Sequence, residues 1–124
     1  MRIISGSFRG KKILEPKDIL TRPLKDLTKE SIFNIINHSK KFNVEIKDAN
    51  ILDLFSGVGS FGLECLSRGA SHLTFVENYR GVLPVLKKNL SSLNTLKKYE
   101  ILEKDILNGS YLKNINIKFD IIFL

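Results

Sequence analysis

The chain has 124 residues, 43% of them hydrophobic, and a formal net charge of +7, a length that fits one domain of about 100–150 residues. Cys65 is the single cysteine, which excludes an internal disulfide and a cysteine-based zinc site and is typical of a reducing compartment. No apolar run approaches the roughly 20 residues of a membrane span and the N-terminus does not resemble a signal peptide, so we expect a cytoplasmic protein.

Residues 1–47 carry most of the positive charge, with 11 basic and 5 acidic side chains, a net of +6 against +1 for residues 48–124. Their beginning, residues 1–20, alternates loosely around Gly6 and Gly10 and predicts a short β-hairpin or extended arm. Clustered Lys and Arg gain free energy by releasing counterions from phosphates, so this segment indicates a polyanionic partner. A merely solubilising surface explains the charge equally well at this point.

A helix is expected next, starting at residues 21–23, because proline is favoured at the first helical position and Pro23 stands there. Its apolar side chains recur at helical spacing: Leu24, Leu27, Ile32, Ile35 and Ile36. The lysines are expected on the solvent side: Lys25, Lys29 and Lys40. The polar residues 37–49 end this helix and lead into the next unit.

From Asn50 onward, buried strands alternate with helices. We predict strands at residues 51–55, 73–76, 99–103 and 119–124, and helices from the glycine-rich turn to residue 68 and over residues 80–94. Gly69 is expected to cap the first of these helices, and Pro84 to lie in the first turn of the second. This alternation predicts parallel βαβ units in a three-layered α/β fold, with residues 1–47 as an N-terminal appendage.

The last predicted strand, residues 119–124, ends with the chain itself. A buried parallel strand without following residues would leave an unpaired edge, which folded proteins avoid. We therefore expect the 124 residues to be the first part of a longer protein, with an incomplete sheet.

The glycine-rich loop after the first strand is the most informative segment. Gly57, Gly59 and Gly62 have G-x-G-x-x-G spacing between a predicted strand and a predicted helix. Glycine there permits a tight turn and a close approach of a ligand to backbone N–H groups. Proteins that bind NAD, FAD or S-adenosylmethionine (SAM) all use such loops. Asp53 favours SAM, because a carboxylate at the strand end would repel a pyrophosphate and attract the cationic amino-acid end of SAM.

Two further acids are predicted at the same edge of the sheet. Glu77 ends the second strand, where a carboxylate can accept hydrogen bonds from ribose hydroxyls. Asp105 follows the third strand, where it could receive an adenine amino group. Because the carboxyl ends of parallel strands meet at one edge, these acids, Asp53 and the glycines are expected to line one crevice.

Together these segments resemble the RsmD-type 16S rRNA (guanine-N2)-methyltransferases, a family of class I SAM-dependent methyltransferases with a Rossmann-like sheet. The resemblance covers essentially the whole chain and runs through residues 2–6, 8–12, 22–23, 29–34, 52–59, 62–64, 66–70 and 75–77. The N-terminal block and residues 66–70 are its specific parts, since the glycine loop is shared with many methyltransferases. In this family the strand at residues 119–124 leads into an Asp-Pro-Pro-Tyr motif, which is not among the 124 residues.

The resemblance implies SAM-dependent methylation of the exocyclic N2 amine of a guanine in 16S rRNA of the small ribosomal subunit, by a monomeric protein without a metal. Residues 48–124 would form the SAM-binding domain, truncated at its fourth strand, and its ligand contacts would be Asp53, Phe55, Gly57, Gly59, Gly62, Glu77 and Asp105. Residues 1–47 would position the RNA, with phosphate contacts from Arg2, Arg9, Lys11, Lys12 and Arg22. Because the family's Asp-Pro-Pro-Tyr motif supplies the acceptors for the reacting amine, no catalytic residue is assigned and the chain alone is expected to be inactive.

Three other functions stay open. Another nucleic-acid amino-methyltransferase, such as one acting on adenine N6, differs first in the motif that the chain lacks. A SAM- or RNA-binding protein without catalysis is the second alternative. The third, an NAD-dependent oxidoreductase, is disfavoured by Asp53 and by the basic N-terminal segment.

Overall fold

The computed structural model describes residues 1–18, 24–93 and 98–124. The helix start expected at residues 21–23, and with it Arg22, lies outside the described residues.

The centre of the fold is a parallel sheet of four strands. The strands are β1 (Asn50–Asp53), β2 (His72–Val76), β3 (Tyr99–Leu102) and β4 (Ile121–Phe123), and their order is β3-β2-β1-β4. The chain thus moves from β1 outward to β3 and then returns to the other side of β1. Ligands bind at such a switch point in open α/β sheets, outside the carboxyl ends of the strands. The predicted parallel α/β sheet is confirmed, with strand ends that shift by one or two residues.

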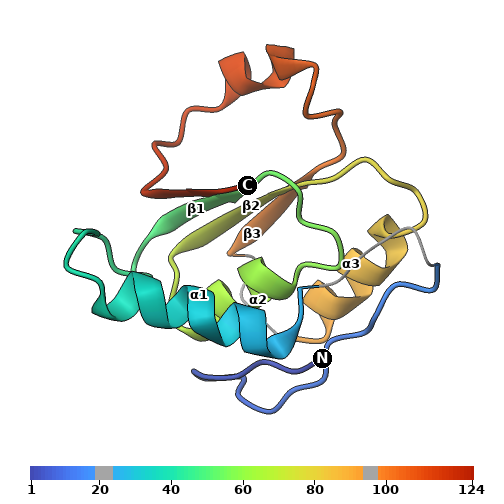
Figure 1. The fold of residues 1–124 in the computed structure, drawn as a ribbon. Coiled ribbons are helices and arrows are strands. Elements are labelled where there is room, and N and C mark those ends of the chain that lie inside the picture. The colour runs from blue at the N-terminus through green and yellow to red at the C-terminus, as the bar shows by residue number, and fades with distance from the viewer. Residues whose placement is uncertain (19–23, 94–97) are drawn as a thin grey trace.

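The three α-helices within the described residues lie on one face of the sheet (Figure 1). They are α1 (Asp26–His38), α2 (Ser60–Ser67) and α3 (Leu83–Ser91). On the other side, the connection from β3 to β4 contains only a short 3-10 helix, Gly109–Asn114 (Figure 1). The predicted three layers are therefore wrong for the described residues, because the return connection contains no α-helix that could cover the second face.

Gly69 and Pro84 lie where predicted relative to the helices, although α3 begins at Leu83 rather than at residue 80 and ends at Ser91. Gly69 follows α2 with φ +98°, and Ala70 N–H donates to the Cys65 carbonyl oxygen at 3.0 Å, which is the geometry of a glycine C-cap. Pro84 lies in the first turn of α3, where its missing N–H removes no helical hydrogen bond.

The buried face of α1 differs from the predicted one. Leu27 is 80% exposed and Ile35 is 55% exposed, whereas Lys29 and Phe33 are fully buried. Lys29 is tolerated inside because Glu64 of α2 lies 3.4 Å from its Nζ, and a buried charge needs such a partner. The prediction of a solvent-facing Lys29 was wrong, since apolar spacing carries no information about an ion-pair partner on another helix.

The N-terminal segment forms a loop rather than a regular hairpin. Its two arms meet in one antiparallel bridge, Arg2 with Lys12, and Ile3 N–H donates to the Lys11 carbonyl oxygen at 2.9 Å. Ile3 and Ile13 are buried in the same apolar cluster as the sheet and helices. The segment therefore shares the core of residues 48–124, and the division between them is one of proposed roles.

Candidate functional site

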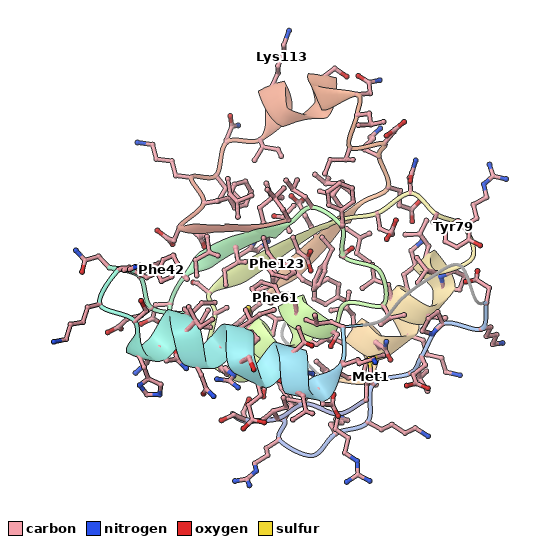
Figure 2. All side chains as sticks on the ribbon, in the orientation of Figure 1. Met1, Phe42, Phe61, Tyr79, Lys113 and Phe123 are labelled. Atoms are coloured by element: carbon pink, nitrogen blue, oxygen red, sulfur yellow. The ribbon has the colours of Figure 1, made fainter. Side chains whose placement is uncertain are left out.

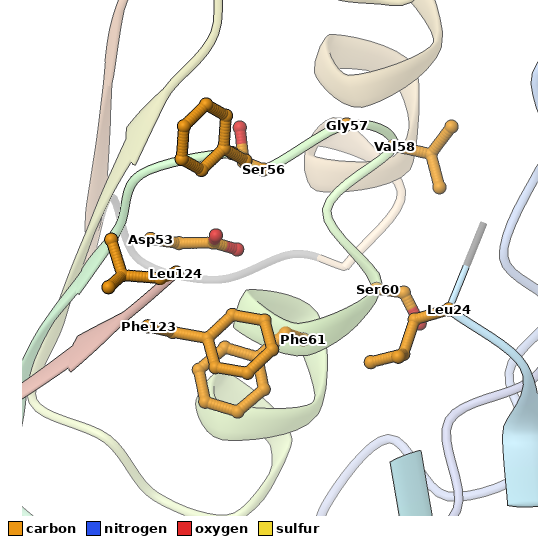
Figure 3. A pocket seen from close by; sticks show the side chains of 10 residues that line it. Leu24, Asp53, Ser56, Gly57, Val58, Ser60, Phe61, Phe123 and Leu124 are labelled. Atoms are coloured by element: carbon orange, nitrogen blue, oxygen red, sulfur yellow. The ribbon is translucent and has the colours of Figure 1, made fainter. Parts of the chain in front are cut away.

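A pocket of about 310 Å³ lies at the carboxyl ends of β1 and β4, beside the start of α2 (Figure 3). Its wall comes from the glycine loop, the strand ends, the start of α2 and a residue two positions before α1: Leu24, Asp53, Phe55, Ser56, Gly57, Val58, Ser60, Phe61, Phe123 and Leu124. Three of the predicted ligand-binding residues, Asp53, Phe55 and Gly57, line this pocket. The switch point of the sheet and the predicted loop thus coincide.

Asp53 is an acid at this site whose pKa is strongly shifted. It ends β1, it is 1% exposed, and its Oδ1 has no hydrogen-bond partner among the described residues. Burial raises the pKa of Asp53 to about 7, against a hydrogen bond from the Phe55 backbone that lowers it, and the nearby Glu77 raises it further. A buried acceptor without a partner is costly, so this oxygen is suited to a donor or a cation supplied by a ligand.

Glu77 holds the glycine loop in place. Its Oε1 accepts the Gly57 backbone N–H at 2.9 Å, and its Oε2 accepts the N–H groups of Asn78 at 3.1 Å and Tyr79 at 3.3 Å. A carboxylate offers about four acceptor sites. Glu77 can therefore receive one more hydrogen bond while it fixes the loop.

The three loop glycines have different roles. A Cβ at Gly57, which has φ +53°, would meet nothing within 4 Å, so the pocket side of this residue is open to a ligand. A Cβ at Gly59 would lie 2.6 Å from Leu86 Cδ1, and one at Gly62 would lie 2.2 Å from Phe75 Cε1. Gly59 and Gly62 thus allow α2 to pack closely on α3 and β2, and neither of them lines the pocket.

Asp105 is placed apart from these residues. It is exposed, its Oδ1 accepts the Leu107 backbone N–H at 2.9 Å in a local turn, and it does not line the pocket. Phe55, in contrast, is 62% exposed at the pocket, where its ring is available to stack on a planar group.

Sequence reasoning missed the aromatic pair at the base of the pocket. Phe61 of α2 and Phe123 of β4 stack with ring centroids 3.9 Å apart and planes 12° from parallel, in the interior between the sheet and α1 (Figure 2). Phe61 follows the glycine loop directly and could have been included from its position. Phe123 could not, because its place depends on β4 pairing with β1 rather than with β3.

The predicted RNA-binding residues lie on the N-terminal loop. Arg2, Arg9, Lys11 and Lys12 are exposed. The loop packs on the second half of α2, where Ile4 N–H donates to Glu64 Oε1 at 2.8 Å and Phe8 N–H to Ser67 Oγ at 2.9 Å. Lys11 Nζ itself donates to the Ser92 carbonyl oxygen. The basic loop is therefore anchored to the end of α2 that is remote from the glycine loop.

Metal-binding clusters and membrane-spanning helices are both absent from the described ranges. Within them, no group of three or more His, Cys, Asp and Glu side chains is arranged to hold a metal ion. In the same residues, no helix combines the length and the apolarity needed to cross a membrane.

Comparison with known proteins gives consistent matches. The profile of the family described as "Conserved hypothetical protein 95" matches residues 1–124. Ribosomal RNA small subunit methyltransferase D of Escherichia coli (strain K12) is 41% identical over 93 residues, 75% of this chain and 44% of that protein. The protein of the same name from Haemophilus influenzae is 34% identical over 125 residues, 100% of this chain and 62% of that protein.

The solved structure of the Escherichia coli protein yhhF has a TM-score of 0.71 and 34% identity to this chain, and the match covers 86% of this chain and 53% of that one. The chain spans between 44% and 62% of the length of the two curated relatives named above. The family match extends over every residue, and the sheet, though incomplete, has the Rossmann-like arrangement of methyltransferases. The chain belongs to the conserved hypothetical protein 95 family, the RsmD-type methyltransferases.

Proposed function

We propose that this chain binds SAM in the pocket at the end of β1 and belongs to an enzyme that methylates the N2 amine of a guanine in 16S rRNA. The observation that carries the proposal is Asp53, a buried carboxylate at the pocket with an oxygen that lacks a partner among the described residues. A pyrophosphate would be repelled by this group, whereas the ammonium of an amino acid would satisfy it.

Residues in the pocket wall, together with Glu77 next to the glycine loop and outside that wall, suit the parts of SAM. Asp53 would accept the ammonium group, and the open side of Gly57 would let the ligand approach the backbone. Glu77 would accept one ribose hydroxyl with its remaining site, and Phe55 would stack on the adenine. Asp105 does not line the pocket and would reach the adenine amino group only from outside the pocket wall.

When bound, SAM supplies an electrophilic methyl group on a sulfonium. The chain's own residues would orient the ligand and exclude water from its amino-acid end, and orientation is a large part of catalysis for a weak nucleophile such as a guanine amine. In the family that the chain resembles, the acceptors for that amine belong to an Asp-Pro-Pro-Tyr motif, which is not among the 124 residues. We therefore assign donor binding to this chain and expect no methyl transfer from these residues alone.

The proposed RNA partner rests on two observations. Both curated relatives described above are named as methyltransferases of small-subunit ribosomal RNA. The N-terminal loop also presents Arg2, Arg9 and Lys12 at the surface, and such cations suit a phosphate backbone. We propose that this loop contacts the phosphates of 16S rRNA.

Calorimetric titration with S-adenosylhomocysteine, the demethylated product, tests the donor site. We expect the wild type to bind and Asp53→Asn to weaken binding by about tenfold, the usual effect of losing a hydrogen bond to a charged group. Asp48→Asn is the matched control, because Asp48 is exposed and asparagine tolerates its φ of +63°. A wild type that does not bind, or an unaffected Asp53→Asn variant, would refute the proposal.

A further inference from the structure

A buried ammonium group lies directly behind the wall of the pocket. Lys29 of α1 is fully buried, and its Nζ lies 2.7 Å from the Arg2 carbonyl oxygen, 3.2 Å from Ser60 Oγ and 3.4 Å from Glu64 Oε1. An ammonium group has three N–H donors and no acceptor. Lys29 thus donates hydrogen bonds to Arg2 and Ser60 and forms ion pairs with Glu64 and, at 4.0 Å, with Asp26 Oδ1.

This arrangement determines which way the Ser60 hydroxyl donates. Because Lys29 can only donate, Ser60 Oγ must accept, and the hydroxyl proton of Ser60 is left for another acceptor. Ser60 is 3% exposed and lines the pocket, and no described residue receives its proton. Ser56 lines the same pocket but donates its own hydroxyl to the Val76 carbonyl oxygen at 3.2 Å.

The backbone next to Ser60 also favours a ligand group that accepts hydrogen bonds. Ser60 is the first residue of α2, and the first bond to a residue four positions earlier runs from Leu63 N–H to the Gly59 carbonyl oxygen at 2.8 Å. The N–H groups before Leu63 precede the helical ladder, and the positive end of the helix dipole lies there. A hydroxyl donor beside such a helix end, with a buried ammonium behind it, suits an anion.

We propose that the Ser60 hydroxyl, positioned by Lys29, donates to the carboxylate of the amino-acid end of the bound ligand. Ser60 and Asp53 lie on either side of the glycine loop, one offering a donor and the other an unpartnered carboxylate oxygen (Figure 3). The zwitterionic amino-acid end of SAM would present its carboxylate to Ser60 and its ammonium group to Asp53. This inference rests on the proposed SAM site. It adds the residue that would distinguish a ligand with both an ammonium and a carboxylate from a ligand with an ammonium alone.

The test compares S-adenosylhomocysteine with its decarboxylated analogue, which retains the amine, by calorimetry on the 124-residue chain. We expect Ser60→Ala to weaken binding of S-adenosylhomocysteine by about tenfold and to leave the affinity for the analogue unchanged. Ser31→Ala is the matched control, because it removes an exposed hydroxyl of α1 that lies outside the pocket and donates to the Leu27 carbonyl oxygen, and it should leave the affinity for both ligands unchanged.

The wild type alone provides a second measurement, since it should bind the decarboxylated analogue at least about tenfold more weakly than S-adenosylhomocysteine. Equal wild-type affinities, or a Ser60→Ala variant that loses both ligands equally or neither, would overturn the role of Ser60 and leave the SAM site standing. A wild type that binds neither ligand would instead overturn the proposed function, and this inference with it.

Discussion

The carboxylate of Glu77 accepts the backbone N–H of Gly57 at 2.9 Å. This bond joins the residue after β2 to the loop after β1. The glycine loop is therefore held both by its own strand, β1, and by the end of the neighbouring strand, β2. The acid predicted to bind a ribose therefore also shapes the pocket before any ligand arrives.

Glu77→Ala should weaken binding of S-adenosylhomocysteine and of methylthioadenosine, which lacks the amino-acid end, by a similar factor of about ten. The common loss is expected because Glu77 serves the nucleoside and the loop rather than the amino-acid head. Calorimetry with both ligands measures it, and Glu100→Ala, at an exposed position of β3, is the control. Unchanged affinities would contradict both roles.

The stability of the ligand-free chain should depend on pH through Asp53. Burial raises the pKa of Asp53 in the folded chain from 3.8 to about 7. The stabilisation associated with the protonated group is complete below the unfolded pKa and is lost as the pH rises through the folded pKa. We expect the free energy of unfolding to fall by an amount on the order of 4 kcal/mol across this range. Urea unfolding of the wild type and Asp53→Asn across the same pH range measures this, and an identical pH dependence in both would refute it.

Substitution by alanine should lower the free energy of unfolding by different amounts at the different loop glycines. Gly62→Ala places a Cβ 2.2 Å from the buried ring of Phe75, and overpacking of this kind costs about 1–3 kcal/mol or more. Gly57→Ala meets no atom within 4 Å and bears only the strain of φ +53°, about 1 kcal/mol. Urea unfolding of the two variants gives the comparison. Equal costs would mean that Gly62 is not packed as described.

Lys29→Met should destabilise the fold by about 1.5–3 kcal/mol, because the buried Glu64 loses one cationic partner and keeps Arg68 at 2.9 Å. Burial lowers the pKa of Lys29, and the adjacent Glu64 opposes that shift. Lys25→Met, one turn earlier and exposed, is the matched control and should change the free energy of unfolding little. A Lys29→Met variant as stable as the control would show that the ion pair is unimportant.

The proposed RNA contacts are best tested by neutralising basic side chains rather than by removing the N-terminal segment. Removing residues 1–20 would also remove Ile3 and Ile13 from the core. The double change Arg9→Gln and Lys12→Gln should instead weaken binding of a 16S rRNA fragment and reduce the slope of log K against log salt by about 1.5.

Lys40→Gln with Lys41→Gln removes the same charge from exposed positions beyond α1 and should leave the slope nearly unchanged if only the N-terminal loop contacts RNA. Equal slopes in the two double variants would show that the loop acts only as part of the general surface charge.

The sequence by itself determined the order of strands and helices along the chain and the edge of the sheet where the glycine loop lies. The spacing of apolar residues shows which face of each element is buried, and Gly69 and Pro84 act through local backbone preferences. Both signals can be read from the sequence without knowledge of distant contacts. Asp53 was predictable in the same way, because a strand end followed by a glycine loop has one usual place in a parallel sheet.

Only the tertiary structure decided which side chains meet across elements. The burial of Lys29, the free hydroxyl proton of Ser60 and the stacking of Phe61 on Phe123 all depend on contacts between segments far apart in sequence. Local spacing predicts an apolar helix face, but a buried ion pair forms only where another helix supplies the opposite charge. The sequence thus indicated the edge of the sheet at which we propose that a ligand binds, and the packing of α1 on α2 decided that the Ser60 hydroxyl accepts from Lys29.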